Sequence, residues 1–146
     1  MSIELQDSFV TRVDFSNQPQ PPGTNIKLLH NYSYNVKYGK GDFCKGDLEC
    51  HVKAEGLEDK VHLDFTICGV FRYSPDMPKE KVHTESYHLL YPAAAAFAAT
   101  LTVNSGMRPI RLIKMDIKPS SIYRFDLGGI RGIKNNEDAN GNDEKT

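Results

Sequence analysis

The sequence predicts an α+β fold in which a four-stranded antiparallel sheet packs with one long alanine-rich helix. Two observations support this. Four segments alternate between apolar and polar residues, which is the pattern of strands with one face toward a core. A later stretch, residues 87–109, has no charged residue before Arg108 and contains four consecutive alanines. Because the links between successive strands are short, we expect the strands to form a meander.

Each expected strand is defined by the residues that share one face. The strands lie near residues 8–16, 30–38, 46–54 and 61–73, and a proline-rich loop separates the first two. The alternation falters at Gly69, where we expect a bulge. The shared faces hold Phe9, Thr11, Val13 and Phe15, then Tyr32, Tyr34, Val36 and Tyr38, then Leu48, Cys50, Val52 and Ala54, and finally Val61, Leu63, Phe65 and Ile67.

The helix is expected from about Leu89 to Asn104. Pro92 suits its first turn, where the missing N–H of proline costs nothing, and Gly106 suits its C-terminal stop.

Both sides of this helix are apolar. Leu90, Phe97 and Leu101 form a stripe suited to packing on the sheet, but a domain of one sheet and one helix has nothing to cover the opposite face. We therefore expect self-association through that face, although the segment after Arg108 could fold back over it instead. The expected interface residues are Ala95, Ala96, Ala99 and Val103.

The length, net charge and hydropathy of the chain exclude several classes of function. The chain has 146 residues and a net charge of −1, which suggests one domain (residues 1–133) and a disordered polar tail (residues 134–146). No overall charge attracts nucleic acid or an anionic membrane, so neither is an expected partner. The strictly apolar stretch, residues 89–99, is shorter than the roughly 20 residues that a membrane span needs. With no secretory leader expected, the predicted location is cytoplasmic.

Polar groups give weak signals for chemistry. Cys44, Cys50 and Cys68 are irregularly spaced, so we expect free thiols and no metal site. His62 and Asp64 share the outer face of a strand, but no nucleophile stands beside them. We therefore expect a solvated sheet face, no cofactor and no enzymatic activity.

The segment "ICGVFRYS", followed by a loop and "YHLLYPAAAAFAATLTVNSGMRPIRLIKMDI", resembles the SecB family of bacterial protein-export chaperones. The likeness covers roughly residues 9–118, and the matching positions are Gly69, Val70, Phe71, Tyr91, Pro92, Gly106 and Pro109. It implies a chaperone that holds unfolded polypeptide clients without ATP. It also implies assembly as a dimer or a dimer of dimers, that is, a homotetramer.

The resemblance also implies sites. Asp14 and Asp64 match acidic positions that dock the motor protein SecA in the family. The family has a second helix where this chain has the glycine-bearing residues 120–132, which suggests a chaperone of a toxin–antitoxin system as the alternative to an export chaperone. The expected client-binding residues are Phe71, Tyr73, Tyr87, Leu90, Met107, Ile110 and Leu112.

A rival of another class is a small-ligand-binding or enzymatic α+β domain, with the helix closing a pocket over the sheet. That function needs polar groups that converge on the inward face. The sequence offers only Thr11 and the hydroxyls of Tyr32, Tyr34 and Tyr38.

Overall fold

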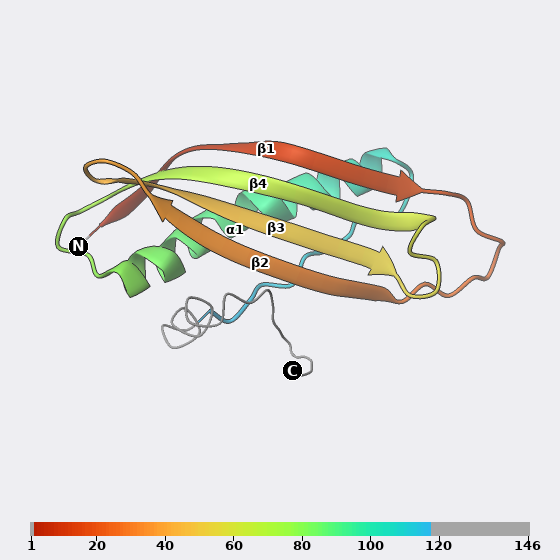
Figure 1. Ribbon diagram of the computed structural model, residues 1–146. Coiled ribbons are helices and arrows are strands. Elements are labelled where there is room, and N and C mark those ends of the chain that lie inside the picture. Colours follow the sequence, from red (N-terminus) through yellow and green to blue (C-terminus); the bar gives the residue numbers. More distant parts are fainter. Residues whose placement is uncertain (1, 118–146) are drawn as a thin grey trace.

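The computed structural model describes residues 2–117. Strands β1 (Ile3–Asn17), β2 (Leu28–Tyr38), β3 (Phe43–Ala54) and β4 (Val61–Tyr73) form one antiparallel sheet, and helix α1 (Lys79–Asn104) lies across one face of it (Figure 1). The predicted four-stranded sheet with one long helix is confirmed. The expected polar tail and residues 120–132 lie outside the described residues.

The strand order is β1-β4-β3-β2, so the predicted meander holds only for the last three strands. β1 pairs with β4 because the link in residues 18–27 is too long for a tight hairpin and crosses the end of the sheet. Two hydrogen bonds tie this link to the turn between β3 and β4. The Gln18 N–H donates to the Lys60 carbonyl (3.0 Å), and the Glu55 N–H donates to the Lys27 carbonyl (2.8 Å).

β1 contains two irregularities that the alternation concealed. The pairing with β4 shifts between Leu5 and Asp7 and again between Val10 and Arg12. An extra residue in one strand inverts the faces of those beyond it. Phe9 therefore lies on the outer face of the sheet and is 42% exposed, so its predicted sharing of a face with Val13 and Phe15 is wrong.

Gly69 does not form the predicted bulge. It pairs in regular register with Ser8 of β1 and with Gly46 of β3. A Cβ at this position would lie 2.8 Å from Cζ of Phe71 and 3.0 Å from Cδ1 of Leu90. Glycine is required here because a neighbouring ring and a helix side chain occupy the space, which explains the gap in the apolar alternation.

α1 begins at Lys79, ten residues before the predicted start, and Pro92 lies well inside it. The charged residues of the first turns concealed the helical period in the sequence. Pro92 removes one hydrogen bond, to the His88 carbonyl, which the other turns of a long packed helix tolerate.

The C-terminal end of α1 is as predicted at Gly106, whose φ of +90° favours glycine. The Gly106 N–H donates to the Val103 carbonyl (3.0 Å), and the Met107 N–H donates to the Thr102 carbonyl (3.2 Å). This pair of bonds is the Schellman motif, which satisfies carbonyls that the helix leaves free.

The face of α1 toward the sheet differs from the predicted stripe. Leu90 is fully buried as expected, but Phe97 and Leu101 are only half-buried at its side. The sheet supplies large side chains such as Phe65, and small helix residues let the backbone approach them closely. The buried helix residues are Val82, Ser86, Tyr87, Leu90, Ala94, Ala98 and Thr102.

Candidate functional site

Within the described residues, the rest of the chain covers one side of α1 and leaves the other side open. On the β2 side, residues 107–117, here called the return segment, run back along the helix (light blue in Figure 1). On the β1 side and on the face turned away from the sheet, the part of the chain that the structure describes leaves apolar side chains exposed.

Three tyrosine hydroxyls hold the return segment by its main chain. They come from α1 and β2, so the segment lies between the helix and the edge of the sheet. These three bonds hold backbone atoms, so they form whatever the side chains of the segment are. The bonds are Tyr91 O–H to the Leu112 carbonyl (2.7 Å), the Ile113 N–H to Tyr32 Oη (3.0 Å) and the Met115 N–H to Tyr87 Oη (2.6 Å).

Two side chains of the return segment, Ile110 and Leu112, are buried in the core. The Ile110 N–H donates to Thr102 Oγ1 at 2.9 Å. Burial also raises the pKa of Tyr32 and of Tyr87, so both hydroxyls stay protonated near neutral pH. The segment is therefore part of the folded protomer, and one side of it faces solvent, where Ile113 is 57% exposed.

The face of α1 turned away from the sheet carries an apolar seam. Leu89, Ala96 and Val103 are exposed and seven residues apart, and Pro92 and Ala99 fall between them. Apolar residues at this spacing form the contact line of packed helices. Of the predicted interface residues, Ala96 and Val103 are exposed on this seam, Ala99 lies on it but is half-buried, and Ala95 lies beside it and is also half-buried. The return segment leaves the seam exposed.

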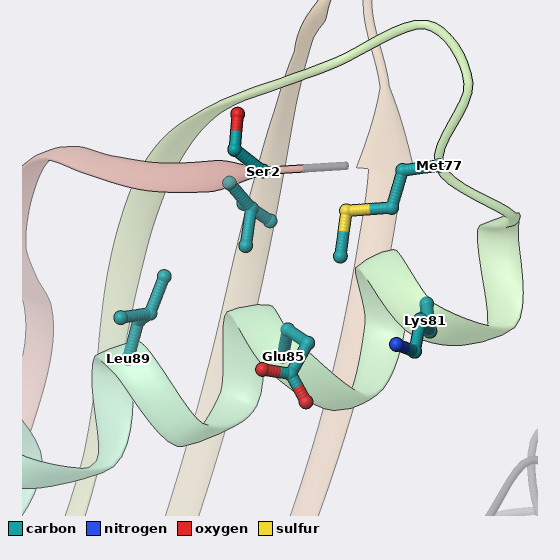
Figure 2. Close-up of a pocket in the computed structure, with 6 residues that line it drawn as sticks. Ser2, Met77, Lys81, Glu85 and Leu89 are labelled. Atoms are coloured by element: carbon teal, nitrogen blue, oxygen red, sulfur yellow. The ribbon is translucent and has the colours of Figure 1, made fainter.

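A cavity of about 320 Å³ lies at the N-terminal end of the open flank, between the start of β1 and α1. Figure 2 shows Leu89, the first residue of the seam, beside it, with Lys81 and Glu85 on the same helix. The cavity therefore adjoins the first residue of the seam, and its lining combines apolar and charged side chains. Its lining residues are Ser2, Ile3, Met77, Lys81, Glu85 and Leu89.

The outer face of the sheet brings together the two aspartates expected to dock SecA. Asp14 and Asp64 are directly opposite each other in β1 and β4. His51 Nδ1 lies 2.7 Å from Asp64 Oδ1, and His62 Nε2 lies 3.1 Å from Asp14 Oδ1. The hydrogen bond to Asp14 raises the pKa of His62. Docking of SecA here stays a prediction.

The polar groups that an internal ligand pocket would need form hydrogen bonds within the protein itself. Tyr34 Oη pairs with Ser86 Oγ at 2.6 Å, and the Tyr38 hydroxyl donates to the Lys79 carbonyl at 3.3 Å. Tyr32 holds the return segment, and Thr11 donates to the carbonyl of Thr66 at 3.3 Å. These groups do not converge on a cavity.

No family model matches the sequence, and no curated protein matches it. A solved structure does: the Mycobacterium tuberculosis SecB-like chaperone Rv1957, in complex with a ChAD peptide from the HigA1 antitoxin. The two chains are 16% identical, the match covers 77% of this chain and 90% of that chain, and the TM-score is 0.62. The chain has a SecB-like fold.

Within the SecB-like fold, most of the residues expected to bind clients are core residues. Tyr73 and Met107 are only half-buried. The others are apolar residues of the kind that a core also requires, and their side chains are inaccessible to a client in this conformation. Client binding by the set stays a prediction. The buried residues are Phe71, Tyr87, Leu90, Ile110 and Leu112.

Sequence reasoning missed two exposed apolar residues of this SecB-like fold, Leu89 and Ile113. The seven-residue spacing from Leu89 to Ala96 was a readable signal. No sequence pattern marks Ile113 as exposed, because its exposure depends on the path of the return segment. Within residues 2–117, no helix is long and apolar enough to cross a membrane.

Cys44, Cys50 and Cys68 are free, as predicted, and the structure buries all three. Burial raises the pKa of Cys44 to about 11 and raises the pKa of the other two thiols. At pH 8 a thiol of that pKa has about 200-fold less thiolate than an ordinary one. We expect Ellman's reagent to label the native protein at least 100-fold more slowly than the unfolded chain. A thiol that reacts rapidly in the native protein would contradict this burial.

Proposed function

We propose that this protein is a SecB-like chaperone that holds non-native polypeptides without ATP. The observation that carries the proposal is the apolar surface that the protomer leaves exposed on its own extended segment, where Ile113 is accessible on the β2 side of α1. Holding needs no catalytic group, and it needs accessible apolar side chains bordered by polar ones.

The client surface that we propose lies along β2 and the return segment. β2 is an edge strand, and an extended polypeptide can add main-chain hydrogen bonds to such an edge. Next to it, Ile113 offers an exposed apolar contact, and Lys114 Nζ lies 5.8 Å from the Tyr91 ring centre at the rim. Non-specific main-chain pairing together with apolar contacts suits a chaperone with many clients.

A light-scattering assay with a thermally unfolding reporter enzyme tests the holding activity. The wild-type chain should suppress aggregation at near-stoichiometric amounts. We expect Ile113→Ser to weaken client binding about tenfold, because roughly 1.5 kcal/mol of apolar contact is lost. Arg111→Ser is the matched control, since it truncates an exposed residue of the same segment that is charged rather than apolar. Absence of suppression by the wild type would overturn the proposal.

The client class has two candidates, an exported preprotein or an antitoxin. The antitoxin peptide bound to the similar mycobacterial chaperone favours the second. Fluorescence anisotropy would compare an unfolded preprotein with the ChAD peptide of the HigA1 antitoxin. At least tenfold tighter binding of the peptide would support the antitoxin role, and the reverse would support export.

A further inference from the structure

The outer face of the sheet, opposite α1, carries a compact group of nitrogen and oxygen ligands. The potential ligand atoms of Asp14, His62 and Asp64 all lie within 4.8 Å of one another. The three residues come from two paired strands, so the backbone ladder fixes their spacing. The sequence alone predicts an ordinary solvated face here, because the pairing of β1 with β4 cannot be read from it.

The ring of His62 is oriented from outside this group. Its Nδ1 lies 2.8 Å from the Glu58 carbonyl, which can only accept, so Nδ1 carries the proton. In the neutral ring the lone pair is then on Nε2, which faces Asp14 Oδ1 at 3.1 Å. Metal-binding histidines have this arrangement, with the other ring N–H donated to a backbone carbonyl. Two lone-pair atoms this close need a proton or a cation between them.

The distance between His62 and Asp14 suits a small divalent cation. Zinc binds histidine nitrogen and carboxylate oxygen at about 2.0–2.2 Å, which places two ligand atoms of a tetrahedral site roughly 3.3 Å apart. The observed 3.1 Å between His62 Nε2 and Asp14 Oδ1 is close to that value. The side chain of His62 is only 17% exposed, so little conformational freedom is lost when it binds.

Asp64 is oriented by a second histidine. His51 Nδ1 lies 2.7 Å from Asp64 Oδ1, and His51 Nε2 lies 3.6 Å from Glu49 Oε1. A carboxylate held in this way is preorganised as a ligand, and outer-shell partners of this kind typically change metal affinity by 10–100-fold.

We propose that Asp14, His62 and Asp64 bind a divalent cation of the zinc class, with His51 as the residue that positions Asp64. One imidazole and two carboxylates favour Zn²⁺, Co²⁺ or Ni²⁺ over Mg²⁺ or Ca²⁺, which prefer all-oxygen sites. Three protein ligands leave a fourth position for water or for a ligand from a partner protein. This site is independent of the proposed holding activity, because it lies on the other face of the sheet.

Isothermal titration of the tag-free, full-length protein with ZnCl₂ tests the site. We expect one ion per chain, binding weakened at least 100-fold by His62→Gln or Asp14→Asn, and a 10–100-fold loss in His51→Gln. His30→Gln is the control, since His30 bonds to Tyr32 in β2, away from the site, and it should bind zinc like the wild type.

A second measurement needs no substitution. Bound Co²⁺ should broaden the imidazole proton signals of His62 and His51 in the wild-type NMR spectrum and leave those of His30 sharp. No saturable zinc binding would show that His62 and Asp14 share a proton only, and it would overturn the proposal. Equal affinity in the wild type and His62→Gln would place the ion elsewhere and overturn it equally.

Discussion

Replacing Gly46 with alanine should lower the free energy of unfolding by about 3 kcal/mol. The added methyl group would collide with the hydroxyl of Tyr34 and would lie 2.7 Å from Cζ of that ring. Tyr34 is buried, and its hydroxyl is 2.6 Å from Ser86 Oγ, which itself donates to the His83 carbonyl. Moving the ring would both overpack the core and break a buried hydrogen bond between the sheet and α1.

Urea unfolding followed by circular dichroism measures this effect. Gly39→Ala is the matched control, because its added Cβ would meet only the Phe43 carbonyl oxygen at an ordinary 3.6 Å. Adding Tyr34→Phe to Gly46→Ala removes the colliding hydroxyl and should recover part of the loss. Equal unfolding midpoints for Gly46→Ala and Gly39→Ala would show that the ring moves aside without cost.

The strands were predictable where the sequence pattern and the sheet agree residue by residue. β3 is a central strand, and its inward residues alternate without interruption from Cys44 to Ala54. β1 is an edge strand with two register shifts. Its pairing could not be predicted, because the extra residue at each shift cannot be recognised in the sequence. The helix start was missed because Lys79 to Lys81 read as part of a charged loop, although Val82 already lies on the buried face.

Most of the candidate sites depend on contacts between residues that are far apart in the sequence. The outer face of α1 was readable from its alanines, because periodicity is local. The contact of Asp14 with His62 could not be predicted from the sequence, because it requires the first strand, β1, to pair with the last strand, β4. In a simple meander β1 would lie beside β2, and these side chains would be two strands further apart. The tyrosine bonds to the return segment likewise join positions up to 81 residues apart.

We propose that copies of this chain associate through the seam, and Ala96→Glu should then convert the assembly into monomers. Ala96 is the middle residue of the exposed seam, seven residues from both Leu89 and Val103, and its small side chain lets a second helix approach. A buried, unpaired carboxylate in such a contact costs several kcal/mol, so the dissociation constant should rise at least 100-fold. Light scattering coupled to size-exclusion chromatography over a range of concentrations measures the mass.

The substitution separates assembly from folding. Alanine and glutamate are both good helix formers, and position 96 is exposed in the protomer, so the circular dichroism spectrum should not change. Asn35→Glu, on the exposed outer face of β2, adds the same charge and should leave the mass unchanged. If the Ala96→Glu protein keeps the wild-type mass, the copies meet through another surface. If the wild type is itself a monomer at every concentration, the apolar seam is available to clients, and Ala96→Glu should then weaken holding instead.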